Sequence, residues 1–212
     1  MLNTVSDLVM AWGRGWAASR GVPAPVGVPG GWRAEVGLPG HRLRHVLHTW
    51  DTGRLTTLDR QADRPGAWVK VVGDRAALRA ALPSRWAMAE DGFLMTAGFR
   101  PRAEPAPAGY QITVTTEDTL LTAVARDSGG NRAAAAHLGR AGSFGVPDRV
   151  ETEPGHRRRG LGTVLMTTLG EHAVRLGMTT GVLVATDAGQ HLYRTLGWET
   201  VAPIAAAFLP ED

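Results

Sequence analysis

The chain has 212 residues, of which 43% are hydrophobic and 20% are charged, so it is long enough to bury a core and too apolar for wholesale disorder. It contains no cysteine, which excludes a disulfide framework, a thiolate metal site and a cysteine nucleophile. The formal net charge is +3, and Lys70 is the only lysine among 23 basic residues. Residues 1–100 carry 13 basic and 8 acidic side chains, whereas residues 101–212 carry 10 and 12.

Charge and hydropathy also narrow the class of partner. No apolar run reaches the roughly 18–20 residues of a membrane-crossing helix, so we expect no membrane partner. The apolar patch Leu8–Trp12 follows Asp7 rather than a basic segment, so we expect no signal peptide and a cytoplasmic protein. The only dense basic cluster, Arg157–Arg159, lies in the net acidic half. Nucleic-acid binders usually concentrate positive charge on one face or tail, so we expect no nucleic-acid partner.

A proline-rich stretch divides the chain. Pro101–Gly109 holds three prolines and has no apolar periodicity, which predicts a linker at 101–109. This linker would separate an N-terminal domain (1–100) from a C-terminal domain (110–212). Six of the seven tryptophans precede it, so the two halves differ in character.

Apolar periodicity predicts an α/β chain. Alternating apolar residues indicate strands, and a spacing of three to four indicates helices. In the N-terminal half we expect a helix over 4–19, a strand-like stretch over 45–50, a strand over 67–72 and a helix over 75–81. In the C-terminal half we expect strands over 110–115, 120–126, 133–138 and 144–152, a helix ending at Gly177, a strand over 181–185, a helix over 189–196 and a strand over 201–208.

Three histidines in the N-terminal half could in principle bind a metal. His41, His45 and His48 have the spacing of one helical face. The segment reads poorly as a helix, however, and no carboxylate lies at ligand spacing. We therefore expect surface or hydrogen-bonded histidines, and no metal site.

The junction between the fourth C-terminal strand and its helix carries the clearest chemical signal. Pro154 ends the strand, and Gly160 and Gly162 lie in the turn that opens the helix. The first amides of a helix have no partner within it, and the helix dipole adds partial positive charge there. Together with Arg157–Arg159, this turn predicts an anion site suited to a pyrophosphate. The alternative is an ordinary basic loop before an ordinary helix.

Two motifs in this half resemble the GNAT superfamily, the acyl-CoA-dependent N-acyltransferases. The first is Arg157-x-x-Gly160-x-Gly162 after Val150-x-Thr152-x-Pro154, and the second runs from His191 to Trp198. The resemblance covers about residues 110–212. It implies an α/β fold with a mixed, mainly antiparallel central sheet flanked by helices.

The resemblance also assigns roles to residues. The end of the fourth strand, at a bulge, is implied to offer backbone groups of Val150 and Thr152 to the pantetheine arm and the thioester carbonyl. Tyr193 is implied to protonate the departing thiolate, although it could instead be a packing residue. Amides of the turn are implied to bind the pyrophosphate of coenzyme A, which designates Arg157, Arg158, Arg159, Gly160, Leu161, Gly162 and Thr163.

The general base is left open by the sequence. A neutral amine must lose a proton when it attacks a thioester, and Glu151 on the fourth strand is our first candidate acceptor for that proton. A bulge in this strand would reverse the face that Glu151 occupies, so a solvent-facing or structural role is the alternative. Glu153 and His156 are weaker candidates.

The sequence departs from the family in two places. Residues 116–119 leave no room for the helices that the family usually has between its first two strands, and Thr186 stands where the family often has an asparagine that contacts the cofactor. The missing helices form one wall of the substrate cleft. Our hypothesis is that the N-terminal half is a degenerate copy of the same fold and supplies that wall.

We therefore predict an N-acyltransferase that moves an acetyl group directly from acetyl-CoA to the amine of a small-molecule or peptide acceptor. Many relatives are dimers, so a homodimer is an expectation from the resemblance. One alternative is a non-catalytic CoA-binding regulatory or accessory protein. Another is an arginine-rich nucleic-acid binder, against which the −2 charge of residues 101–212 argues.

Overall fold

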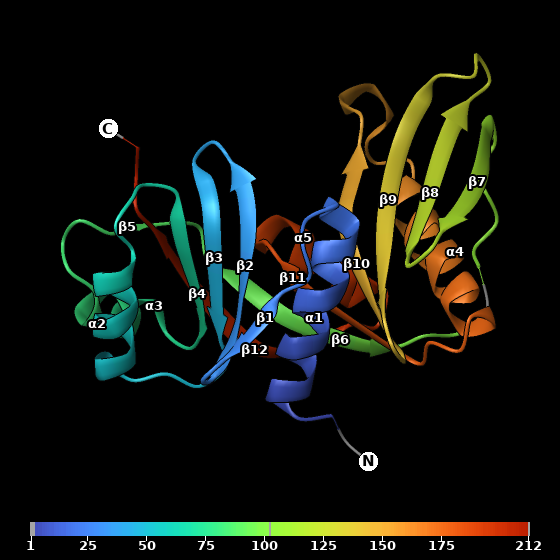
Figure 1. Ribbon diagram of the computed structural model, residues 1–212. Coiled ribbons are helices and arrows are strands. Elements are labelled where there is room, and N and C mark those ends of the chain that lie inside the picture. Colours follow the sequence, from blue (N-terminus) through green and yellow to red (C-terminus); the bar gives the residue numbers. More distant parts are fainter. Residues whose placement is uncertain (1–2, 102, 212) are drawn as a thin grey trace.

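The computed structural model describes residues 3–101 and 103–211, and all of its elements lie within these ranges (Figure 1). The helices are α1 (Val5–Arg20), α2 (Thr52–Gln61), α3 (Arg75–Ala81), the 3₁₀ helix η1 (Pro154–His156), α4 (Leu161–Arg175) and α5 (Asp187–Thr195). The strands are β1 (Val26–Val28), β2 (Gly31–Leu38), β3 (His41–Leu47), β4 (Ala67–Val72), β5 (Ala87–Met88), β6 (Gly92–Gly98), β7 (Tyr110–Glu117), β8 (Leu120–Asp127), β9 (Arg132–Ala141), β10 (Phe144–Thr152), β11 (Thr180–Ala185) and β12 (Glu199–Phe208).

The strands form one mixed sheet in the order β1-β2-β3-β4-β12-β6-β11-β10-β9-β8-β7, with β5 paired to β12. Two pairs in this sheet are parallel, namely β3 with β4 and β10 with β11. Each parallel pair is joined by a helix, α2 in the first case and α4 in the second. Parallel neighbours need such a crossover, whereas the remaining antiparallel pairs do not. The sheet is therefore mainly antiparallel and flanked by helices, as predicted.

Both halves repeat the order strand, helix, parallel strand, helix, strand. In the N-terminal half the order is β3-α2-β4-α3-β6, with the short β5 before β6, and in the C-terminal half it is β10-α4-β11-α5-β12. The last strand of each half leaves its own parallel pair and joins the other half. Thus β6 pairs with β11, β12 pairs with β4, and the two exchanged strands pair with each other. This repetition is what a degenerate copy of one fold predicts.

Helix α1 covers one face of the middle of the sheet, and α2, α3, α4 and α5 cover the other (Figure 1). Neighbouring residues on the strands show this division. Val182 on β11 packs in the cluster beneath α1, and Leu183 packs beneath α5. Ile204 on β12 likewise belongs to the α1 cluster, while Ala205 packs with α2 and α3. Because α1 contacts β9, β10 and β2, it ties the two halves together.

The sequence of α1 explains its boundaries and its position. Thr4 and Asp7 form a capping box at its start, and Gly21 ends it in the left-handed conformation with φ 63°. Gly15 approaches β9 so closely that a Cβ built on Gly139 would lie 2.0 Å from the Gly15 carbonyl oxygen. Two tryptophans of α1 pack on Trp32 of β2 in the core. Trp12 meets the Trp32 ring edge to face at 5.6 Å, and Trp16 stacks on it at 6.0 Å, by ring centroids.

Most predicted elements are confirmed, but the N-terminal half contains errors. The strand predicted over 45–50 is wrong at both ends, because β3 runs from His41 to Leu47 and Asp51 then caps α2. Five elements of this half were not predicted: β1, β2, α2, β5 and β6. Helix α2 has only two buried residues, Leu55 and Leu58, so its apolar period is too sparse to read from the sequence. In the C-terminal half every predicted strand and helix is present. Strand β10 has the predicted bounds, and the other elements have shifted ends.

We expect Gly139→Ala to destabilise the protein by about 1–3 kcal/mol, because the added methyl group would collide with the backbone of α1. Urea unfolding followed by tryptophan fluorescence measures this free energy. Gly98→Ala on β6 is the matched control, since a Cβ there meets no atom within 4 Å. Equal stability of the two variants would contradict the close packing of α1 on β9.

Candidate functional site

The sheet opens at the end of β10. This strand is paired with β11 only at Phe144–Thr180 and Gly145–Gly181, and the two strands are unpaired beyond those positions. On its other side β10 stays paired with β9 as far as Thr152. The unpaired edges of β10 and β11 therefore leave backbone groups available in the centre of the sheet.

A β-bulge determines which side chains face each side of this opening. Asp148 pairs with His137 and Glu151 pairs with Ala135, so β10 has one extra residue between them. Arg149 lies in this bulge with a φ of 50°. Because His137 and Ala135 are two positions apart, the bulge places Asp148 and Glu151 on the same face. Asp148 bonds to α1, so Glu151 also projects toward the α1 face, where it is exposed.

The backbone of Val150 and Thr152 is oriented toward the opening. The Glu153 amide donates to the Ala133 carbonyl at 2.9 Å, so residues 151 and 153 direct their backbone groups to β9. Residues 150 and 152 therefore direct theirs to the side of β11. The Thr152 carbonyl there accepts a hydrogen bond from the Arg157 Nε at 3.2 Å. The bulge and this orientation are the features that the sequence predicted for the end of the strand.

Helix α4 begins at the same opening and has no side-chain cap. Gly160, its N-cap residue, lies in the left-handed region with φ 77°, and no side chain accepts a hydrogen bond from the first turn. In residues 3–101 and 103–211, the other four α-helices are capped by Thr4, Asp51, Asp74 and Thr186. The amides of Leu161–Thr163 thus remain available for an external anion. Thr186, at the family's asparagine position, serves as the cap of α5.

The three arginines surround this helix end but differ in their contacts. Arg157 is held by the Thr152 carbonyl, and the Arg159 Nη1 donates to the Tyr110 hydroxyl at 3.0 Å. Arg158 is exposed and has a φ of 62°. His156 lies 2.9 Å from the Tyr110 hydroxyl through its Nδ1, so it belongs to the support of the loop. The loop is therefore fixed at both sides while the amides of Leu161–Thr163 stay free.

The second motif lies beside the first in space. A Cβ built on Gly162 would lie 3.1 Å from the Leu192 Cδ2 atom of α5, so the glycine allows α5 to approach the start of α4. Tyr193 and Val150 pack against the same apolar cluster, which includes Leu183 and Trp198. Burial, with a smaller contribution from the charge of Asp148, raises the pKa of Tyr193 to about 12. Its phenol therefore stays protonated at neutral pH.

Asp148 is a site residue that sequence reasoning missed. Its Oδ2 accepts from the Ser19 Oγ at 2.7 Å and from the Arg20 Nε at 2.6 Å, and its Oδ1 accepts from the Arg20 Nη2 at 3.0 Å. Burial alone would raise the pKa of Asp148, but the hydrogen bonds from Arg20 and Ser19 outweigh it and lower the pKa. Its partners are 128 and 129 positions away, so no local sequence pattern could have indicated the interaction.

Half-buried basic side chains lie on the α1 face of the N-terminal half. The Arg44 guanidinium lies 4.4 Å from the centre of the Trp16 ring, and its Nε donates to His41 at 3.0 Å. Burial and the charge of Arg44 lower the pKa of Lys70 to about 8 and that of His41 to about 3. The face that Glu151 shares with α1 therefore has a positive neighbourhood.

The N-terminal half has no equivalent anion site at its crossover helix. Asp51 occupies the N-cap of α2, and its carboxylate accepts from the Arg54 amide at 2.8 Å. A carboxylate in this position repels a phosphate and uses a free amide. Within the described ranges, no group of three or more His, Cys, Asp or Glu side chains could hold a metal ion, and no helix has the length and apolarity for crossing a bilayer.

Comparison with known proteins agrees with this geometry. Residues 118–200 match a family model described as an acetyltransferase (GNAT) domain. No curated protein matches the sequence. Residues 118–200 therefore form a GNAT domain, which confirms the resemblance seen in the motifs.

Similar solved structures extend the likeness in fold to both halves. A putative GNAT acetyltransferase from Novosphingobium aromaticivorans aligns with a TM-score of 0.61 and 16% identity, covering 95% of this chain and 99% of that one. A GCN5-related N-acetyltransferase from Kribbella flavida aligns with a TM-score of 0.60 and 18% identity over 80% and 82% of the two chains. A tandem GNAT protein from the clavulanic acid biosynthesis pathway has a TM-score of 0.56 and 15% identity over 74% and 68%. At these identities the alignments establish the fold.

We expect Asp148→Asn to lower the free energy of unfolding by about 1–2 kcal/mol at neutral pH, a value reduced by solvent around the partly exposed Arg20. The lowered pKa means that the carboxylate stabilises the fold above the ordinary value of 3.8, and that this contribution is lost as the pH falls below it. Urea titrations between pH 7 and pH 3 measure both effects. Asp118→Asn, at an exposed turn, is the control. If the stability difference between Asp148→Asn and the wild type were the same at pH 3 as at pH 7, the carboxylate of Asp148 would not be its cause.

Proposed function

We propose that this protein is an acyl-CoA-dependent N-acetyltransferase that transfers an acetyl group directly to an amine within a ternary complex. The observation that carries the proposal is the uncapped start of α4 beside the unpaired edge of β10. In a GNAT domain this pairing of features supplies a diphosphate site next to a backbone edge. The cleft would be shared between the two halves, because α1 forms its wall on the face of Glu151.

The residues present fit acetyl-CoA. The Leu161–Thr163 amides would bind its diphosphate, with Gly160 keeping the approach open and Arg157, Arg158 and Arg159 adding charge. The backbone groups of Val150 and Thr152 would bind the pantetheine arm, since they face the opening. Bound acetyl-CoA would supply the acetyl thioester.

Two side chains are proposed as catalytic residues. Glu151 accepts the proton that the acceptor amine loses when its nitrogen bonds to the acetyl carbon. Tyr193 donates a proton to the sulfur as the carbon–sulfur bond breaks, and its raised pKa ensures that the proton is present. Glu151 lies on the α1 face, and Tyr193 belongs to α5 on the opposite face. The proposed base and the proposed acid would then act from the two sides of the opening.

The electrostatics of the α1 face favour an acceptor that carries an acidic group beside its amine. Arg44 and Lys70 are half-buried there, and Arg20 lies beside Asp148. A polycationic acceptor would be repelled by these charges. The acceptor is accordingly proposed to be a small amine or peptide with a carboxylate. The protein is proposed to act in the cytoplasm and to form a homodimer. A CoA-binding protein without catalysis is the alternative.

The anion site can be tested by charge at Gly160. Asp and Asn both tolerate the left-handed conformation and have nearly the same shape, so they differ mainly in charge. We expect Gly160→Asp to weaken acetyl-CoA binding at least about tenfold, or 1.4 kcal/mol, because its carboxylate repels the diphosphate. Gly160→Asn should bind within a few-fold of the wild type. Isothermal titration measures both, and equal affinities of the two variants would refute this site.

The catalytic assignment is tested by Tyr193→Phe. We expect kcat to fall by about 100-fold, with acetyl-CoA affinity unchanged, because the variant removes only the proton donor. Thiol release is measured with a panel of amines that contains amino acids and polyamines. Glu151→Gln should lower kcat at neutral pH. The reduction relative to the wild type should be smaller at high pH, where the amine is already neutral. Absence of thiol release with every amine would favour the non-catalytic alternative. Thiol release that Tyr193→Phe leaves unaffected would refute Tyr193 as the proton donor.

A further inference from the structure

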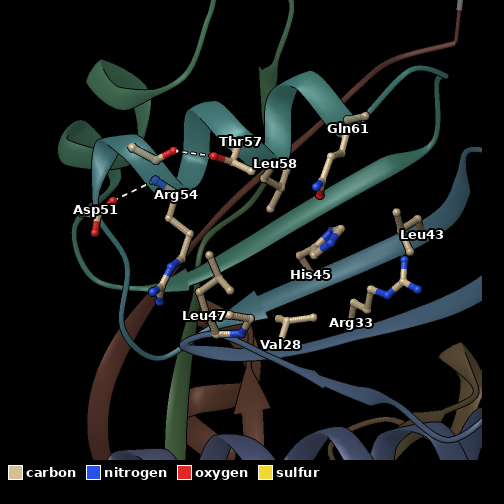
Figure 2. A pocket seen from close by; sticks show the side chains of 13 residues that line it. Val28, Arg33, Leu43, His45, Leu47, Asp51, Arg54, Thr57, Leu58 and Gln61 are labelled. Carbon is tan, nitrogen blue, oxygen red and sulfur yellow. Dashed lines mark hydrogen bonds between the residues drawn. The ribbon is translucent and has the colours of Figure 1, made fainter.

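A large cavity lies in the N-terminal half, away from the acetyl-CoA site. It has a volume of about 860 Å³ and lies between α2 and the strands β2 and β3 (Figure 2). This volume is within the range of small-molecule sites. Its apolar walls are formed by Val28, Leu43, Leu47, Leu58 and Ala62.

The cavity exists because the sheet is narrower in this half. In the C-terminal half, α4 packs on β8 and β9, whose leucines and alanines fill the space beneath the helix. In the N-terminal half the sheet ends at β1, and the residues of β2 directed toward α2 are Arg33 and Glu35. Charged side chains cannot fill an apolar layer, so the space under α2 stays open.

His45 is the feature that points to a ligand. It is only 9% exposed, it lines the cavity, and its Nδ1 has no hydrogen-bond partner among the described residues. Figure 2 shows its ring between β3 and the Gln61 side chain of α2. Burial and the charge of Arg33 lower the pKa of His45 to about 4, so the imidazole is neutral at pH 7. A buried polar atom without a partner is unfavourable. Because the Nδ1 has almost no accessible surface, the ring must turn toward the cavity before a ligand can supply the missing bond.

The charges of the walls indicate the sign of that ligand. Arg33 lies directly opposite His45 on the neighbouring strand, and its ion pair with Glu35 is long, at 3.8 Å, and exposed. Arg54 also lines the cavity, whereas Asp51 is engaged as the cap of α2. The guanidinium of Arg33 can therefore bind a carboxylate, and a neutral imidazole that carries its proton on Nδ1 can donate to the same group.

We propose that this cavity binds a small carboxylic acid with an apolar chain, its carboxylate on Arg33 and His45 and its chain against Leu43, Leu47 and Leu58. The site is separate from the proposed transfer reaction. Arg33 and His45 supply few donors for a polyphosphate, and the apolar walls favour a ligand with one charged end.

The probe is octanoate, titrated calorimetrically into the full chain. We expect saturable binding at one site, and weaker binding of butyrate and of octan-1-ol, which lack the chain length or the charge. Arg33→Gln should weaken octanoate binding at least tenfold, while Arg60→Gln, which removes an arginine of α2 outside the cavity, should leave it unchanged. Leu58→Trp should abolish binding by filling the cavity.

Two results of the octanoate titration would overturn the proposal: absence of octanoate binding, or binding that Arg33→Gln and Leu58→Trp both leave intact. Acetyl-CoA binding in the same variants separates this site from the first. We expect it to be unchanged by Arg33→Gln, and octanoate binding to be unchanged by Gly160→Asp. Loss of both ligands in both variants would mean a single shared site and would also refute the cavity as an independent one.

Discussion

The exchange of the strands β6 and β12 is the constraint on which the rest of the structure depends. Each strand completes the half to which it does not belong in sequence, and the two pair with each other at the centre. The exchange satisfies the second edge of β4 and of β11, whose first edges pair with β3 and β10. An unpaired buried strand edge would be unfavourable. The N-terminal half, whatever it binds, thereby shares one sheet with the residues that match the GNAT domain.

Two crossover helices with similar surroundings have opposite chemistry at their first turns. Helix α4 starts at a glycine and leaves its amides free, whereas α2 starts at Asp51, whose carboxylate occupies the same kind of position. One residue at each N-cap thus separates a half suited to a diphosphate from a half that repels one. The half without the anion site contains instead the cavity beneath α2, with the neutral His45 in its wall.

The bulge in β10 links the fold to the proposed chemistry. By adding one residue between Asp148 and Glu151, it places both carboxylates on the face covered by α1. The two acids then have different environments. Asp148 is held by Ser19 and Arg20, while Glu151 remains exposed. Tyr193 lies on the other face in α5, so the separation of β10 from β11 would allow the proposed acid and base to act on one group.

The sequence alone determined the C-terminal elements, the turn from Arg157 to Thr163 and the family, because these depend on local periodicity, on glycine conformation and on motif spacing. It did not determine β2, α2 or β6, whose apolar periods are short or sparse and whose positions depend on partners elsewhere in the chain. The face of Glu151 was ambiguous until the bulge was seen, since one residue reverses the alternation of a strand. The strand exchange, the pairing of Asp148 with α1 and the cavity at His45 join residues far apart in sequence, so only the tertiary structure could decide them.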